Sequence, residues 1–197
     1  MARTRTFIGI DIGDGIRNNA VSLQETLAKT GAEVKWASPD SLHVTLLFLG
    51  EVDDRELHPV CKAVAAVAAT EPAFTLRVGG VGAFPNARRP KVVWGGVTDG
   101  AESLQRLNAA LEEEMLELGC YRTEERGYTP HLTLGRVKGD SDSALLAADL
   151  PKRLNWDGGR FAVDEVLVFS SDMERGGPVY TVIGRAPLGT RVPSARG

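Results

Sequence analysis

One short pattern occurs twice in the chain, as His43-Val44-Thr45-Leu46 and as His131-Leu132-Thr133-Leu134. Alternate residues of a β-strand face the same side, so each copy presents an imidazole and a hydroxyl together. The aliphatic residues between them would face a hydrophobic core. Two such strands brought together predict one site with two imidazoles and two hydroxyls.

This set of side chains is suited to acid–base attack on a phosphodiester, because one imidazole can donate a proton while the other accepts one. A single histidine in a strand is more often structural than catalytic. The repeated context makes catalysis the better interpretation for His43 and His131. His58 is the remaining histidine of the three in the chain; it has no such context, and we expect it at the surface.

Hydrophobic periodicity predicts the same order of elements in both halves: a helix, a histidine strand, a second helix and two further strands. In the first half the helices span 15–29 and 54–70, and the strands span 74–81 and 91–97. In the second half the helices span 101–118 and 143–150, and strands over 161–170 and 178–183 are joined by a loop over 171–177. Two more strands are expected over 6–11 and 34–36.

The repeat predicts two similar α/β lobes about a pseudo-twofold axis. Since no linker separates them, we expect a single domain over residues 1–197, with each of two intertwined lobes contributing one histidine strand.

The charge distribution favours a small anionic ligand. The net charge of −3 argues against broad non-specific binding to nucleic acid, yet Arg88, Arg89 and Lys91 form a local basic patch. This balance suits the end of an RNA better than a long duplex.

Compartment and redox state follow from two further features. The chain has no apolar run near the roughly 20 residues that span a bilayer, and Asp11 interrupts its first apolar stretch too early for a signal peptide. We therefore expect a cytoplasmic protein without a membrane partner. Cys61 and Cys120 lack a metal-binding spacing and are predicted to be buried free thiols.

The two histidine patterns are accompanied by three other sequence features, namely the loop containing Phe84-Pro85 and Arg88, the following Val93-Trp94, and the later 168–171 stretch with Tyr180. Together they resemble the two-histidine phosphoesterase superfamily, in particular its RNA 2′,3′-cyclic phosphodiesterase branch, also called 2′-5′ RNA ligase. The resemblance runs from Phe7 to about Leu188.

The resemblance implies a bilobal α+β fold in which antiparallel sheets line a central cleft. It also implies hydrolysis of a terminal 2′,3′-cyclic phosphate to a 2′-phosphomonoester without a metal or cofactor, with 2′-5′ ligation as a possible reverse reaction. Carried over by motif, His43 is the proton donor to the departing 3′ oxygen and His131 is the proton acceptor for the attacking water. Thr45 and Thr133 would hold the phosphoryl oxygens.

Arg136 presents a conflict between alternation and resemblance. Strict alternation from His131 places Arg136 on the face opposite the catalytic one, whereas the family often carries a basic residue here. A β-bulge at Gly135 would turn it toward the cleft.

Other substrate-binding residues are expected at the cleft rim. Arg88 and Arg89 are candidates for RNA binding, with a solvated loop as the alternative. Phe84 or Tyr128 could stack on a nucleobase.

Three classes of function remain open at this level. The first is the phosphodiesterase, acting as a monomer on RNA termini or on another cyclic or 2′-5′-linked nucleotide. The second is a non-catalytic module that binds nucleotides or RNA ends. The third is a zinc enzyme with the histidines as ligands, against which stands the lack of a third ligand at a recognisable spacing.

Overall fold

The computed structural model describes residues 2–122, 127–175 and 177–189. Within them, nine strands form one sheet in the order β7-β4-β5-β6-β3-β1-β8-β9, with β2 paired to β6, and every ladder is antiparallel. The strands are β1 (Arg3–Ile10), β2 (Val34–Trp36), β3 (Val44–Asp53), β4 (Phe74–Phe84), β5 (Val92–Asp99), β6 (His131–Val137), β7 (Asp157–Val163), β8 (Glu165–Glu174) and β9 (Gly177–Pro187). The helices are α1 (Gly13–Ala28), α2 (Leu57–Ala68), α3 (Ala101–Glu117) and α4 (Asp140–Asp149).

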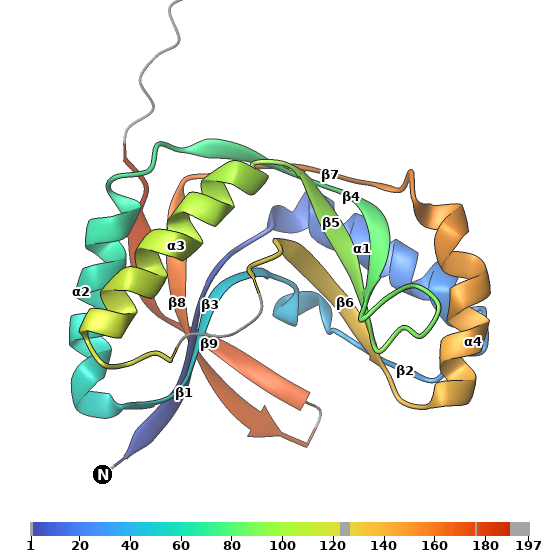
Figure 1. Ribbon diagram of the computed structural model, residues 1–197, viewed down its shortest axis with the longest axis horizontal. Coiled ribbons are helices and arrows are strands. Elements are labelled where there is room, and N and C mark those ends of the chain that lie inside the picture. Colours follow the sequence, from blue (N-terminus) through green and yellow to red (C-terminus); the bar gives the residue numbers. More distant parts are fainter. Residues whose placement is uncertain (1, 123–126, 176, 190–197) are drawn as a thin grey trace, which may run out of the picture.

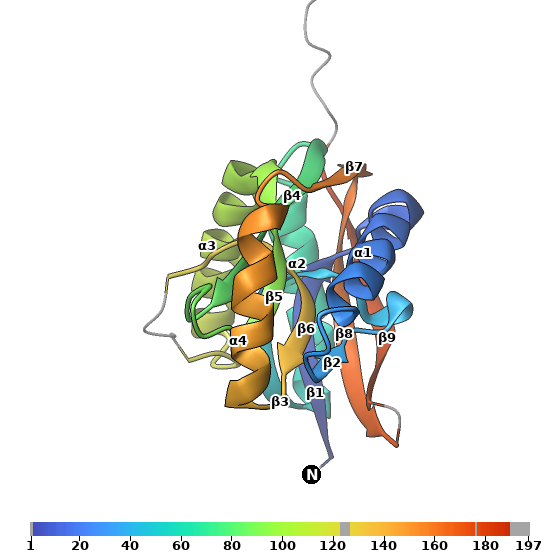
Figure 2. The same ribbon diagram turned by 90° about the vertical axis from the view of Figure 1, so that its right-hand side faces the viewer.

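The sheet consists of two halves that meet where β3 pairs with β6, through Val44 and Leu132. One half contains β7, β4, β5 and β6 and packs against α1 and α4; the other contains β3, β1, β8 and β9 and packs against α2 and α3. In Figure 1, α2 and α3 lie at one end of the molecule and α4 at the other; Figure 2 shows the same elements end-on. The predicted bilobal α+β fold with antiparallel sheets is confirmed.

The repeated unit begins with a strand, whereas the predicted unit began with the helix that follows this strand. With β2 and β7 left aside, the order β1-α1-β3-α2-β4 recurs as β5-α3-β6-α4-β8. The sheet order places β3 opposite β6, β1 opposite β5 and β8 opposite β4 about its middle. The helix before each histidine strand packs on the other half, α1 against β7 and α3 against β3. Periodicity locates an element along the chain but does not say which half it joins.

The predicted strand over 161–170 was wrong, because it is two strands separated at Asp164. β7 pairs with β4 at one edge of the sheet, whereas β8 pairs with β1 and β9 near the other. The predicted loop over 171–177 is also mostly strand. Residues 171–174 pair with 177–180 as the end of the β8–β9 hairpin, and residue 176 lies outside the described residues. Most side chains of residues 171–175 are polar and exposed, so a prediction based on hydrophobicity does not detect this hairpin.

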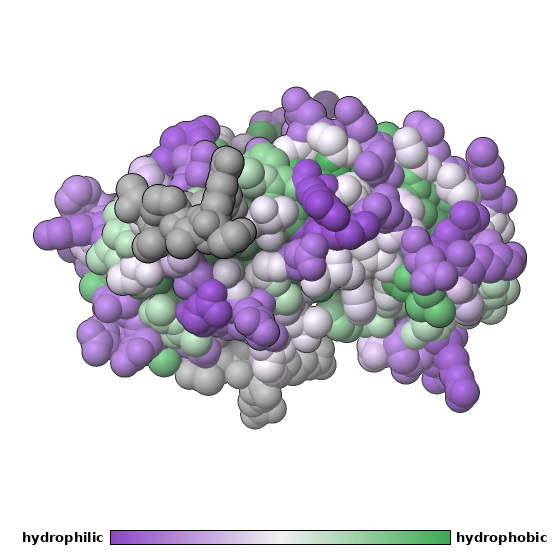
Figure 3. All heavy atoms as spheres, turned by 90° about the horizontal axis from the view of Figure 1, so that it is seen from above, coloured by the Kyte–Doolittle hydropathy of each residue, from purple (hydrophilic) through white to green (hydrophobic). Residues whose placement is uncertain are grey.

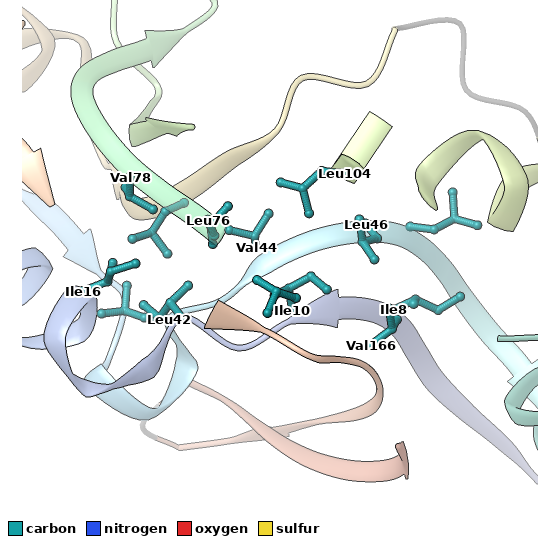
Figure 4. Packing of buried hydrophobic residues seen from close by; sticks show 14 of the residues in the cluster. Ile8, Ile10, Ile16, Leu42, Val44, Leu46, Leu76, Val78, Leu104 and Val166 are labelled. Carbon is teal, nitrogen blue, oxygen red and sulfur yellow. The ribbon is translucent and has the colours of Figure 1, made fainter. Parts of the chain in front are cut away.

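One hydrophobic core spans both halves on one side of the sheet. Val44 and Leu132 are fully buried in it, and Figure 4 shows Val44 among Ile10, Leu46 and Leu76. Burying each such side chain contributes about 1.5–3 kcal/mol relative to its exposure. A smaller separate cluster joins Phe7, Leu167 and Phe169. Because the aliphatic residues of the two histidine motifs face this core, the motif histidines and threonines lie on the opposite face of β3 and β6.

The remaining predictions concern the surface and the thiols. Hydrophilic side chains occupy most of the outline in Figure 3, with apolar side chains between them. No helix in the described part of the chain is long and apolar enough to cross a membrane. Cys61 and Cys120 are free, as predicted, but both are only partly buried. The reason is position: Cys61 lies at the contact between α2 and β9, and Cys120 lies just beyond the end of α3.

Candidate active site

The pairing of Val44 with Leu132 determines how the motif residues lie together. Continuing this antiparallel register by one residue sets His43 opposite Thr133 and Thr45 opposite His131. All four side chains share the face opposite the buried Val44 and Leu132. Diagonal neighbours of a ladder have side chains about 7–8 Å apart. The two histidines occupy one diagonal and the two threonines the other, so a phosphoryl group placed between them would lie within reach of all four.

Each imidazole is held by the backbone two residues before it. His43 Nδ1 donates to the Ser41 carbonyl at 2.7 Å, and His131 Nδ1 donates to the Thr129 carbonyl at 2.7 Å. A carbonyl oxygen only accepts hydrogen bonds, so Nδ1 carries a hydrogen in both rings. This fixes the ring orientation and leaves both Nε2 atoms for proton transfer.

The two Nε2 atoms have different surroundings. His43 Nε2 lies 2.9 Å from Thr45 Oγ1, whereas His131 Nε2 has no hydrogen-bond partner among the residues that the structure describes. A protonated imidazole donates from both nitrogens. The site therefore offers two acceptors to a protonated His43 and one to a protonated His131.

Both histidines have pKa values below the ordinary range. Burial is the largest cause of the lowered pKa of His43; the hydrogen bond to Ser41 opposes it, and the positive charge of His131 lowers the pKa further. Burial also lowers the pKa of His131, against the hydrogen bond to Thr129, and Arg136 adds to the lowering. Each ring gives up its proton more readily than a histidine in water.

Aromatic side chains cause this burial on both sides. The His43 ring lies 4.7 Å from the Phe7 ring and 5.2 Å from that of Tyr180, measured between centroids. The His131 ring lies 5.0 Å from Phe84, edge to face, and 6.2 Å from Trp94. Phe84, predicted as a stacking platform, thus contacts a catalytic candidate directly.

A hollow of about 420 Å³ opens on the His43 side. Its lining includes His43, Thr45, Thr133, Arg136 and Tyr180. Arg5 and Lys35 also line it, and no aspartate or glutamate occurs among the described residues of its wall. On a chain of net charge −3, such a concentration of positive charge favours an anionic ligand.

Arg136 reaches this hollow through an irregularity in β6. Val93 pairs with Gly135 and Trp94 with Thr133, so β6 contains one more residue than β5 over this stretch. Such a bulge interrupts the alternation of side chains, which is why Arg136 is not on the face that strict alternation gives. A Cβ at Gly135 would come within 2.7 Å of the Trp36 ring, so glycine permits the close packing here.

The other predicted binding residues lie outside the wall of this hollow. Tyr128 donates its hydroxyl hydrogen to the Thr45 carbonyl at 2.9 Å and packs against the core, and burial raises its pKa. Arg88 and Arg89 are exposed in the loop after β4, where their backbone N–H groups donate to Asn86 Oδ1. His58 is exposed on α2, as predicted.

Sequence reasoning left Phe7, Arg5 and Lys35 out of the site. Arg5 and Phe7 come from β1, which lies far from both motifs in sequence. Lys35 comes from β2, a strand of three residues that carries no pattern of its own. Within the described residues, no group of three or more His, Cys, Asp or Glu side chains could hold a metal ion.

Comparison with known proteins agrees with this geometry. Residues 20–175 match the family model of the 2′-5′ RNA ligase superfamily. The chain is 35% identical to the RNA 2′,3′-cyclic phosphodiesterase of Methanothermobacter thermautotrophicus, over 91% of this chain and 96% of the relative.

Two solved structures share the fold. A protein of Thermus thermophilus superposes with a TM-score of 0.78 at 29% identity, over 95% of this chain and 99% of that one. E. coli LigT complexed with 3′-AMP superposes with a TM-score of 0.74 at 26% identity, over 94% of this chain and 98% of that one. With the paired histidine motifs, the shared fold and a family match over most of its length, the chain belongs to the 2′-5′ RNA ligase superfamily.

Proposed function

We propose that this protein hydrolyses the 2′,3′-cyclic phosphate at the 3′ end of RNA to a 2′-phosphomonoester, by acid–base catalysis between His43 and His131. The observation that carries the proposal is the Val44–Leu132 pair, which sets two imidazoles and two hydroxyls on one face of the sheet. The relatives named RNA 2′,3′-cyclic phosphodiesterase support the choice of substrate, and so does the 3′-AMP bound to the related LigT.

In the proposed reaction, His131 Nε2 accepts a proton from water as its oxygen attacks phosphorus. The bond from phosphorus to O3′ breaks, and His43 Nε2 gives its proton to O3′. The products are a free 3′-hydroxyl and a 2′-phosphate. A 5′-hydroxyl in place of water would give a 2′-5′ linkage by the same proton transfers, and the reverse of that step would cleave a 2′-5′ linkage to a cyclic phosphate.

Two features support this division of roles. His43 has acceptors at both ring nitrogens, which suits the ring that begins protonated. The hollow also lies on the His43 side, where a ribose attached through O3′ needs space. His131 lies against Phe84 and Trp94 outside the lining of that hollow, and the position opposite O3′ has to admit only a water molecule.

Thr45, Thr133 and Arg136 are assigned to the phosphoryl oxygens. Negative charge increases on these oxygens in the five-coordinate transition state, and positioned donors lower its energy. Arg88 and Arg89 are assigned to RNA beyond the terminal nucleotide, because they are exposed and do not line the hollow. Phe84, whose ring lies against His131, is assigned to base contact at the cleft rim. Tyr128 is assigned instead to holding β3, through its hydrogen bond to the Thr45 carbonyl.

The experiment is turnover of a 2′,3′-cyclic mononucleotide and of a cyclic-phosphate-terminated RNA, each with and without a metal chelator. We expect turnover of both, unchanged by the chelator. A non-catalytic binding module would turn over neither, and a zinc enzyme would lose activity with the chelator. The matched control is His58→Ala, which changes a histidine outside the site.

A further inference from the structure

We propose, given the function proposed above, that Arg5 and Phe48 form a subsite for the phosphodiester group immediately upstream of the terminal nucleotide. The site would then prefer RNA 3′ ends to cyclic mononucleotides. The subsite lies on β1 and β3, beside the catalytic face and apart from the Arg88 loop.

Arg5 and Phe48 contact each other at the wall of the hollow. The Arg5 guanidinium lies 5.0 Å from the centre of the Phe48 ring, and this ring is 40% exposed despite its size. Phe48 pairs across the ladder with Phe7, whose ring packs on His43. A guanidinium placed over an aromatic ring is restrained in orientation while its hydrogen-bond donors stay available.

Arg5 makes no ion pair among the described residues, although Glu51 is the residue opposite it on the β1–β3 ladder. Arg136, on the opposite wall, is likewise without an ion pair in the described part of the chain. Burial raises the pKa of Tyr180, and the positive charges of Arg136 and Arg5 both lower it, which places the two guanidinium groups around one hollow. Two guanidinium groups that make no ion pair in the described part of the chain suit two phosphates of one strand.

The mechanism determines which side the upstream strand occupies. His43 protonates O3′, so the ribose lies on the His43 side of phosphorus. The upstream phosphodiester is attached to the 5′ oxygen of that same ribose. Phe7 adjoins His43 on this side, Phe48 is the ladder partner of Phe7, and the Arg5 guanidinium lies over the Phe48 ring.

Phe48 also lines a second hollow, of about 660 Å³. The wall of this second hollow includes Arg3 and Arg122, but also the carboxylates of Glu51, Asp53 and Glu56. This balance of charge does not favour an anion, so the assigned subsite is a single phosphodiester at Arg5.

The test compares kcat/KM for 2′,3′-cyclic AMP with kcat/KM for a short RNA ending in a 2′,3′-cyclic phosphate. Arg5→Ala is expected to lower the ratio of RNA to mononucleotide activity about tenfold, the loss expected for one charge-assisted contact. Between about 50 and 200 mM salt, a plot of log kcat/KM for the RNA against log salt concentration should also be less steep for Arg5→Ala than for the unmodified protein, by about 0.7. Phe48→Ala should lower the same activity ratio, because the arginine loses its support.

Lys62→Ala is the matched control, since Lys62 is an exposed cation on α2 that lines neither hollow. It should leave the ratio of the two activities unchanged. A length-dependent loss in Lys62→Ala, or an equal loss on both substrates in Arg5→Ala, would overturn the proposal.

If the unmodified protein turned over neither substrate, the proposed function would fail first. Fluorescence anisotropy with the same RNA ending in a 2′-phosphate then tests the subsite without catalysis. Binding weakened about tenfold by Arg5→Ala, and unchanged by Lys62→Ala, would support the subsite. Equal binding by Arg5→Ala and the unmodified protein would contradict it.

Discussion

Thr45→Val tests how the site holds the proton of His43. The substitution keeps the side-chain shape and removes the hydroxyl that lies 2.9 Å from His43 Nε2. If His43 is the proton donor, this hydroxyl accepts a hydrogen bond from the protonated ring, and its loss disfavours the charged form. The pKa of His43, already lowered by burial, should fall further.

The size of the effect follows from the geometry. A hydrogen bond to a charged group contributes about 1.5–3 kcal/mol. His43 is only partly buried, so water replaces some of this and the low end of the range applies. About 1.4 kcal/mol corresponds to one pKa unit, or a tenfold change. Activity is lost on the alkaline side as the donor loses its proton, so this limb should move to lower pH by about one unit.

The assay is kcat/KM for 2′,3′-cyclic AMP as a function of pH, which reports the groups of the free enzyme. Thr133→Val is the control, because Thr133 has no hydrogen bond to either imidazole among the described residues. It should lower kcat at every pH and leave both limbs in place. If Thr45→Val lowered kcat/KM by one factor at all pH values, with an unmoved alkaline limb, Thr45 would not stabilise a protonated His43.

Three further predictions concern other residues. His43→Ala and His131→Ala should each lower kcat about 100-fold or more, and the double variant should lose much less than the product because the two act as a unit; near-normal turnover by either single variant would remove that histidine from the mechanism. Tyr128→Phe removes the 2.9 Å hydrogen bond to the Thr45 carbonyl and should lower the free energy of unfolding by about 1 kcal/mol, measured by urea denaturation; an unchanged denaturation midpoint would show that this bond contributes nothing. Arg88→Ala and Arg89→Ala should raise KM for RNA and leave KM for cyclic mononucleotides unchanged in steady-state assays, whereas an equal rise on both substrates would place these arginines at the terminal phosphate.

The sequence predicts the parts of the site that depend on local pattern. His43, Thr45, His131 and Thr133 are found because an i, i+2 relation within a strand sets two side chains on one face. The structure adds the single pair, Val44 with Leu132, that relates the two strands. That pairing depends on long-range contacts and has no local signal.

Other parts of the site depend on interactions that alternation does not describe. Arg136 lies on the hollow because β6 contains an extra residue opposite β5, where Gly135 packs under Trp36. Phe7 and Tyr180 come to His43 through the pairing of β1, β8 and β9. The break at Asp164 was missed because the apolar residues on both sides of Asp164 and Glu165 were assigned to one strand, whereas the two strands join opposite parts of the sheet.

Identification of the phosphate position in the product tests the central claim most directly. In-line attack by water activated at His131, with His43 protonating O3′, must leave the phosphate on the 2′ oxygen. Phosphorus NMR of the product from 2′,3′-cyclic AMP should therefore show 2′-AMP almost exclusively. A predominance of 3′-AMP would contradict the account, because O2′ rather than O3′ would then be the oxygen that departs opposite the attacking water.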